Sequence, residues 1–304
     1  MDSLESSVKF VLEEEKVKAR VSRIGRSLVL DGPEPIGVAT LVGDMPGVSW
    51  VAAGTTVGSF RELASVARLL AKRYLRSGDR FVVEAEGTGG VTASDVGGLV
   101  TSAALDVAKG ARLAESARVR FRVAFDGEKG AAGVEVKRGP GGAPTGKDQV
   151  VCFVSGGAHS SVLAWEAVLK GFRVRLVHAK QSEESLLAVA RLYSELSHRA
   201  DPRGLSLEVL EGDSIAGALS GYVQSAKVPA YAGYTAGGRK MPGPKILAPL
   251  YLMAEEKFRE EFEALKIKSH DAPEAWNKKG EEKRVVRRFG GVRADVSRVL
   301  DGLR

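Results

Sequence analysis

The chain has 304 residues, of which 44% are hydrophobic and 27% are charged, and its formal net charge is +7. This composition excludes a disordered or collagen-like protein and gives enough length for two or three small domains. No apolar run reaches the roughly 18–20 residues that cross a bilayer, so we expect a cytoplasmic protein with no membrane partner. The basic charge makes nucleic acid a candidate partner.

Sulfur and amide side chains are scarce. Cys152 is the only cysteine, so no internal disulfide, cysteine zinc cluster or Cys-x-x-Cys pair can form. It lies within an apolar run, which favours a buried inert thiol over a nucleophile. Asn occurs once and Gln three times beside abundant Arg, Glu and Lys, a balance typical of thermophile proteins.

The first segment, residues 1–76, predicts a small α+β domain. Apolar and polar residues alternate over 8–12 and 17–21, which favours a half-buried hairpin. Ser59 and Glu62 then form a capping-box pattern, followed by one apolar stripe over 59–74 that predicts a helix.

Residues 77–138 predict a second α+β domain. We expect a strand over 80–85, a helix that Ser94 caps, and two strands over 119–125 and 133–137. Residues 139–148 are rich in Gly and Pro and predict a linker.

The remaining chain predicts a doubly wound parallel sheet over 149–267. Strand patterns over 150–154, 173–178 and 205–210 alternate with helical patterns over 161–170 and around 186–193. The pattern is less regular after Gly212, and an acidic helix is expected near 255–265. Residues 268–304 predict a mobile basic tail with a short helix near 296–300.

One turn of this third domain carries the chemistry. The sequence Ser155-Gly-Gly-Ala-His-Ser160 lies between a buried-type strand and a helix, where glycines and the N-terminal N–H groups of the helix can hold a phosphate. The spacing differs from that of the GxxxxGK[ST] loop and from GxGxxG. It resembles the SGGxDS motif, or PP-loop, of the ATP pyrophosphatases.

The flanking sequence extends the resemblance. The stretch 139–179, with its linker, strand, turn, helix and Val-His strand end, is similar to the tRNA sulfurtransferase (4-thiouridine synthetase) family. Residues 80–138 resemble its THUMP domain, and the preceding part, with Pro46-Gly47-Val48, resembles its ferredoxin-like domain. The resemblance covers roughly residues 8–215 and, loosely, 245–265.

The resemblance implies an activity and its residues. ATP would bind the PP-loop, a tRNA uridine would be adenylated through its carbonyl oxygen, and a sulfur donor would displace AMP. The loop residues Ser155, Gly156, Gly157, Ala158 and Ser160 would wrap the pyrophosphate, and His178 would lie near the nucleotide. Because no cysteine follows Cys152, an external sulfur donor is implied.

One substitution keeps a second hypothesis open. His159 stands where the motif has Asp, and imidazole is a poor ligand for Mg²⁺. We therefore expect either an ATP-dependent tRNA sulfurtransferase, in which His159 is the candidate catalytic residue, or a catalytically inactive paralogue that binds tRNA. We predict no resident metal site, and leave a role for Mg²⁺ with ATP and a homodimer open.

A row of cations predicts the RNA contact. Arg118, Arg120 and Arg122 share one strand face by period two, and guanidinium groups match phosphates. Lys137 and Arg138 join them on the next strand. The alternative is a solvated sheet face. Further candidates for RNA contact, with loop packing or solvated surface as the alternative, are Tyr222, Tyr231, Tyr234, Arg239, Lys240 and the basic tail.

Overall fold

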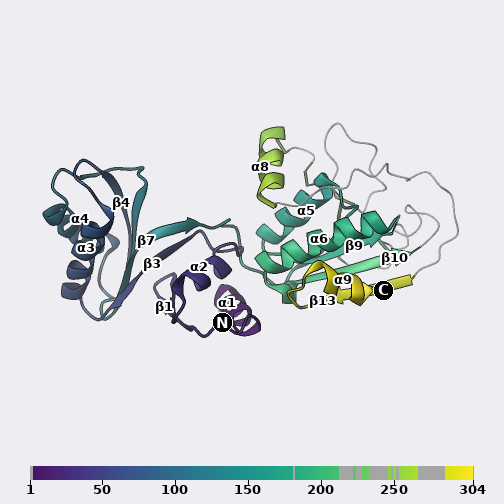
Figure 1. Cartoon of the computed structure of the whole chain (residues 1–304), viewed down its shortest axis with the longest axis horizontal. Helices are drawn as coiled ribbons and strands as arrows, with labels where there is room; N and C mark the ends of the chain where they lie inside the picture. Colours follow the sequence, from purple (N-terminus) through teal and green to yellow (C-terminus); the bar gives the residue numbers. More distant parts are fainter. Residues whose placement is uncertain are drawn as a thin grey trace. The chain divides into compact units, whose positions relative to one another are not determined.

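The structure is a computed structural model that describes residues 3–180, 182–211, 222–223, 228–232, 246–247, 249–250, 253–265 and 285–303. The chain divides into two compact units (Figure 1). Unit 1 comprises 1–44 and 48–139, and unit 2 comprises 45–47 and 140–304. The division at 139/140 falls where the Gly- and Pro-rich linker is predicted.

Unit 1 begins with a helix rather than the predicted hairpin. Helix α1 spans Ser3–Glu14, strands β1 (Arg20–Ile24) and β2 (Ser27–Asp31) form a two-stranded antiparallel sheet, and α2 spans Pro35–Val42. Val8, Val11 and Leu12 are all buried. Their spacing of three and four residues places them on one helical face. The prediction of a strand from the alternation over 8–12 was therefore wrong.

The rest of unit 1 is one five-stranded sheet with two helices. Strand β3 spans Trp50–Val57, β4 Arg80–Gly87, β5 Arg112–Leu113, β6 Val119–Phe125 and β7 Gly130–Arg138, in the order β3-β7-β6-β4-β5. Helices α3 (Phe60–Tyr74) and α4 (Ala93–Val107) pack on it around a core that contains Leu63, Phe81, Val100 and Phe121.

This sheet moves a predicted boundary. Strand β3 pairs with β7 along its whole length, and α3 packs against α4. A division at 76/77 would therefore cut through one hydrophobic core, so residues 50–76 belong with the predicted second domain.

Caps fix the ends of the two helices. Ser59 Oγ accepts from Glu62 N at 3.2 Å, as predicted. The start of α4 differs from the prediction: Thr92, not Ser94, is the N-cap, and Asp95 completes a capping box with it. These side chains satisfy N–H groups that the first turn leaves without partners.

Unit 2 contains a six-stranded sheet in the order β12-β11-β8-β9-β10-β13. Strand β8 spans Gln149–Phe153, β9 Arg173–Ala179, β10 Leu205–Glu211, β11 Ala230–Ala232 and β12 Ile246–Leu247, all in parallel pairs. Helix α5 spans Ala158–Leu169, α6 Glu183–Arg199, the 3₁₀ turn η1 Pro202–Gly204 and α8 Glu255–Leu265. The predicted parallel sheet and acidic helix are present.

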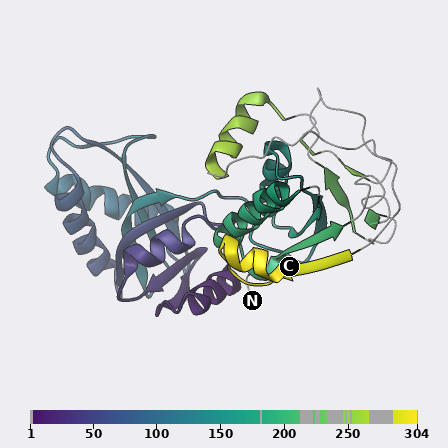
Figure 2. The same ribbon diagram turned by 45° about the vertical axis from the view of Figure 1, so that its right-hand side comes forward.

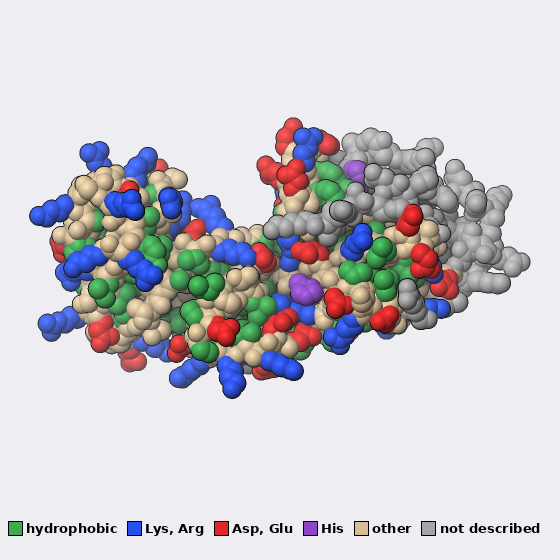
Figure 3. Space-filling model, viewed as in Figure 1, with side chains coloured by type: hydrophobic (Ala, Val, Ile, Leu, Met, Phe, Trp, Pro, Cys, Tyr) green, Lys and Arg blue, Asp and Glu red, His purple; other side chains and the backbone are tan. Residues whose placement is uncertain are grey.

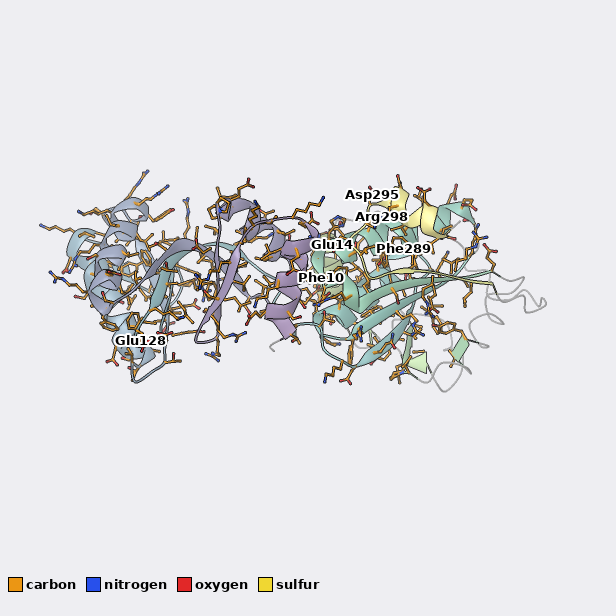
Figure 4. The ribbon with its side chains drawn as sticks, turned by 90° about the horizontal axis from the view of Figure 1, so that it is seen from below. Phe10, Glu14, Glu128, Phe289, Asp295 and Arg298 are labelled. Atoms are coloured by element: carbon orange, nitrogen blue, oxygen red, sulfur yellow. The ribbon has the colours of Figure 1, made fainter. Side chains whose placement is uncertain are left out.

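The C-terminal segment of unit 2 corrects the predicted tail. Strand β13 (Val285–Gly290) pairs antiparallel with β10, and α9 (Val296–Leu303) packs on α6. Phe289 of β13 meets the Tyr193 ring edge-on at 5.3 Å, and Asp295 Oδ1 accepts from Arg298 N at 2.8 Å where α9 begins (Figure 4). Residues 285–303 are thus part of folded unit 2, with Ala294, Val299 and Leu303 in its core, while 268–284 of the predicted tail lie outside the described residues.

Helices α5, α6 and α9 lie on one face of the sheet and share its larger core (Figure 2). A smaller buried cluster around Val151, Phe153, Val177 and Tyr222 lies on the other face. In the part of the chain that the structure describes, no helix is long and apolar enough to cross a membrane.

Candidate functional site

The predicted PP-loop is a tight turn between β8 and α5. Gly156 has φ +89°, a left-handed conformation that side chains rarely adopt. A Cβ at this position would lie 2.8 Å from the Ala188 Cβ on α6. Both the backbone and the neighbouring helix therefore require glycine here.

Hydroxyl groups close the turn from inside. Ser160 Oγ accepts from Ser155 N at 3.2 Å and donates to the Gly157 carbonyl at 2.9 Å. Gly157 N donates to Ser155 Oγ at 3.3 Å. The two predicted serines hold the loop in shape, and Ser155 is only half-buried.

The first turn of α5 suits an anion. Gly157 is its N-cap and no side chain caps it, so the leading N–H groups of Ala158 and His159 point out of the helix as donors. These donors and the glycine fit a phosphate group, as in a bound ATP. Within the described ranges, no cluster of His, Cys, Asp and Glu could hold a metal ion.

His159 lies at the start of α5 and is exposed. Its ring stacks on Phe258 of α8, with centroids 4.5 Å apart and planes at 24°. Phe258 in turn stacks on Phe262, and Lys257 forms an ion pair with Glu166 of α5 at 3.7 Å. The imidazole that replaces the expected carboxylate thus joins the contact that holds α8 against α5.

His178 lies behind the turn with no exposed surface. Its Nδ1 is 2.9 Å from the Val154 carbonyl oxygen and its Nε2 is 3.2 Å from Ser185 Oγ. The ring joins the end of β8 to the first turn of α6, and its contact with a nucleotide stays a prediction.

Cys152 is fully buried in β8, as expected. Burial raises the pKa of its thiol above the usual value, because the thiolate would lie in an apolar core. The folded chain offers this sulfur to no reagent at its surface.

The predicted RNA-binding arginines are mostly engaged within unit 1. Arg120 Nη1 donates to Glu84 at 3.0 Å. Arg122 forms ion pairs with Glu84 and Glu135 and lies over the Trp50 ring, 4.8 Å from its centroid. Burial alone would raise the pKa of Glu135, but hydrogen bonds from Arg122 and Arg138 outweigh it and lower that pKa.

The other predicted cations divide in the same way. Lys137 Nζ is 2.8 Å from Asp44, and Arg138 Nε is 3.1 Å from Glu135. Arg118 is exposed and, among the described residues, forms no ion pair. The period of the strand predicts that these arginines share a face. It does not predict that glutamates of the neighbouring strands lie beside them.

The tyrosines considered for RNA stacking serve the core where they are described. Tyr222 is buried and donates to Glu208 Oε2 at 2.7 Å, and Tyr231 meets the Phe172 ring edge-on. Tyr234, Arg239 and Lys240 lie outside the described residues. Of the tail cations, Arg288 pairs with Glu208 at 2.5 Å.

Sequence reasoning missed two groups of residues. Arg80 and Arg112 lie beside Arg118 at the starts of neighbouring strands, and Phe258 stacks on the exposed His159 ring. Arg80, at the start of a predicted strand, was a signal for the first group, but the short strand that Arg112 begins was not predicted. Nothing local in the sequence indicates the second.

Comparison with solved structures shows the fold over most of the chain. PH1313 from Pyrococcus horikoshii Ot3 is similar with a TM-score of 0.68 and 16% identity, over 87% of this chain and 92% of that one. A 4-thiouridine synthetase in complex with RNA and bound ATP is similar with a TM-score of 0.64 and 15% identity, over 86% and 80%. No family model and no curated protein matches the sequence.

These likenesses confirm the fold and not the chemistry. The chain shares its mixed α/β architecture with both structures over most of its length. At such low identity, substrate and cofactor do not follow from the likeness.

Proposed function

We propose that the chain is an ATP-dependent RNA-modifying protein that acts on a tRNA uridine and thiolates it. The observation that carries this is the uncapped α5 N-terminus behind the Gly156 turn, in a fold shared with a synthetase that binds ATP and RNA. ATP would supply an activated phosphorus for attack by the uridine carbonyl oxygen, with pyrophosphate leaving.

The residues of the turn have distinct tasks in this proposal. Gly156 lets the backbone approach the phosphates, and the N–H groups of Ala158 and His159 donate to them. Ser160 holds Ser155 in place through the 3.2 Å bond. Because Cys152 is buried, sulfur would arrive as sulfide or from another protein.

A second candidate function is RNA binding without catalysis. His159 replaces the carboxylate of the motif and is stacked on Phe258, an arrangement that favours an RNA-binding paralogue without adenylation. The two functions differ in one measurable product, which is AMP.

Nucleotide binding is tested first, by calorimetric titration of ATP into the full chain. We expect Gly156→Ala to lose at least tenfold in affinity, because its Cβ would displace the turn or α6. The matched control is Gly97→Ala in α4, because a Cβ there would lie at an ordinary contact distance of 3.6 Å from the Ala85 Cβ. If wild type binds no ATP, or Gly156→Ala binds as tightly as wild type, the nucleotide site is refuted.

Catalysis is tested by AMP release with a tRNA transcript and sulfide present. Release by wild type, lost in Ser160→Ala, supports the sulfurtransferase. Absence of release from wild type, together with ATP-independent RNA binding, supports the paralogue. Appearance of AMP release in His159→Asp would show that the missing carboxylate is the cause of the inactivity of wild type.

A further inference from the structure

Three neighbouring strands of unit 1 carry an arginine at the same end. Arg80 begins β4 and Arg112 begins β5, and these two residues are cross-strand partners. Arg118 directly precedes Val119, the partner of Phe81, so it lies on the other side of Arg80. Because β4 lies between β6 and β5, the three arginines form one row across the sheet.

The two helices add cations to this end. Helix α3 ends with Lys72 and Arg73 in its last turn, and the loops that follow α3 and α4 meet where Arg112 N donates to the Asp79 carbonyl at 2.8 Å. We call the resulting surface the basic edge. It consists of Lys72, Arg73, Arg76, Arg80, Lys109, Arg112 and Arg118, all of them exposed.

Cations outnumber carboxylates at the basic edge, where the loops also carry Asp79, whose Oδ2 accepts from Arg76 N at 2.7 Å, and the exposed Glu115. Within the described part of the chain, none of its members forms an ion pair, whereas Arg120 and Arg122 on the same sheet do. Asp106, at the end of α4, pairs with Arg68 instead. Figure 3 shows Lys and Arg side chains gathered over α3 and α4 with few acidic ones among them.

The row is costly without an anion. Neighbouring strands lie about 4.8 Å apart, and like charges directly opposite each other destabilise a sheet. Repeated phosphates on one strand would neutralise adjacent guanidinium groups, each of which presents several donors. Tyr74, 38% exposed beneath the Arg73 guanidinium, adds an aromatic ring on which an unpaired base can stack.

We propose that the basic edge is the surface through which unit 1 holds the phosphate backbone of RNA. The proposal rests on the RNA-binding part of the proposed function and deepens it by naming the contact residues. It places the contact at the strand starts and helix ends, beside Arg118, rather than on the ion-paired arginines of the sheet face.

The test compares two triple variants of the full chain with equal loss of charge. Binding of a labelled tRNA transcript is measured by fluorescence anisotropy at several KCl concentrations. The edge variant is Arg80→Gln, Arg112→Gln and Arg118→Gln, and the control is Lys18→Gln, Arg61→Gln and Lys147→Gln at exposed positions elsewhere.

We expect the edge variant to bind at least about tenfold more weakly and its salt slope to fall by about two to three, roughly one per phosphate contact. The control should stay within about twofold of wild type. A second edge variant in the loops, Arg76→Gln with Lys109→Gln, should also weaken binding and avoids any effect on strand pairing.

The outcomes separate the two proposals. If wild type binds RNA and the edge variants bind as well as the control, the basic edge is refuted while the proposed function stands. Equal weakening by edge and control variants also refutes it, because net charge alone would then explain binding. If wild type binds no RNA, both proposals fall.

Discussion

Two groups of arginines on one sheet of unit 1 have opposite surroundings. Arg120 and Arg122 lie over glutamates of neighbouring strands, with only 15% and 10% of their side chains exposed. Arg80, Arg112 and Arg118 lie next to one another at the strand starts, exposed and without described acidic partners. The same residue type thus serves the fold in one region and is available to a ligand in the other.

The comparison predicts different costs of substitution. A paired, covered charge that loses its partner is left desolvated, which is strongly unfavourable. Substituting an exposed charge that lies among like charges should cost little stability, because its removal relieves repulsion. Stability measurements can therefore distinguish the two groups independently of any RNA experiment.

The largest effect is expected where the paired arrangement is buried deepest, at Glu208 in unit 2. Its carboxylate, 1% exposed, accepts from Tyr222 at 2.7 Å and pairs with Arg288 of β13 at 2.5 Å and Arg175 at 3.6 Å. Burial and the bond to Glu208 raise the pKa of Tyr222 to about 12, so its hydroxyl stays a donor at neutral pH.

Glu208→Ala should lower the free energy of unfolding by about 3 kcal/mol, because it removes the buried acceptor of the Tyr222 hydroxyl and the partner of Arg175, whose side chain is 26% exposed. Hydrogen exchange of 285–290 should accelerate, since Arg288 ties this strand to β10. Glu211→Ala, at the end of the same strand and without a described ion pair, is the control. If Glu208→Ala is as stable as wild type, Glu208 and its partners do not stabilise unit 2.

A smaller effect is expected at Glu135, whose side chain is 9% exposed and pairs with Arg122 and Arg138. Glu135→Gln should cost about 2 kcal/mol at neutral pH, since it removes charge-assisted hydrogen bonds. Glu128→Gln, at the exposed tip of the β6–β7 turn (Figure 4), is the matched control and should cost nothing measurable.

The pH dependence of this effect has a definite sign. The folded pKa of Glu135 lies below its ordinary value, so its contribution is complete above the unfolded pKa, about 4.3, and is lost as pH falls through the folded pKa. Urea unfolding from pH 7 to pH 3 should show wild type converging on Glu135→Gln. A constant difference over this range would contradict the pairing.

Local patterns in the sequence predicted the elements well where burial on one face sets the period. The helix over 59–74, the parallel strands and the turn at Ser155 all lie where expected. The first helix was missed because Val8, Phe10 and Leu12 alternate by chance, and only the burial of Val11 reveals the helical face.

Pairing between distant segments could not be predicted from one sequence. The domain boundary at 76/77 failed because β3 finds its partner β7 about eighty residues later, and nothing in either strand specifies the other. Strand β13 was assigned to a mobile tail for the same reason: its arginines look solvated until Glu208 and Tyr193 are placed beside it. The ion pairs of Arg122 were hidden likewise.

The smallest stability effect is expected at the basic edge itself, with Arg80→Gln. Because Arg80 lies between Arg112 and Arg118, removing its charge should leave stability unchanged or raise it by up to about 0.5 kcal/mol. Any gain should vanish in 1 M KCl, where charges farther apart than about 3 Å are screened. The measurement is urea unfolding of Arg80→Gln and Arg122→Gln at low salt and in 1 M KCl.

A loss of stability in Arg80→Gln equal to that in Arg122→Gln would mean that the row of arginines stabilises the fold, and the contrast between the two regions would not hold. A neutral or favourable effect on folding, combined with weaker RNA binding, is the behaviour of a residue whose charge serves a ligand and not the fold.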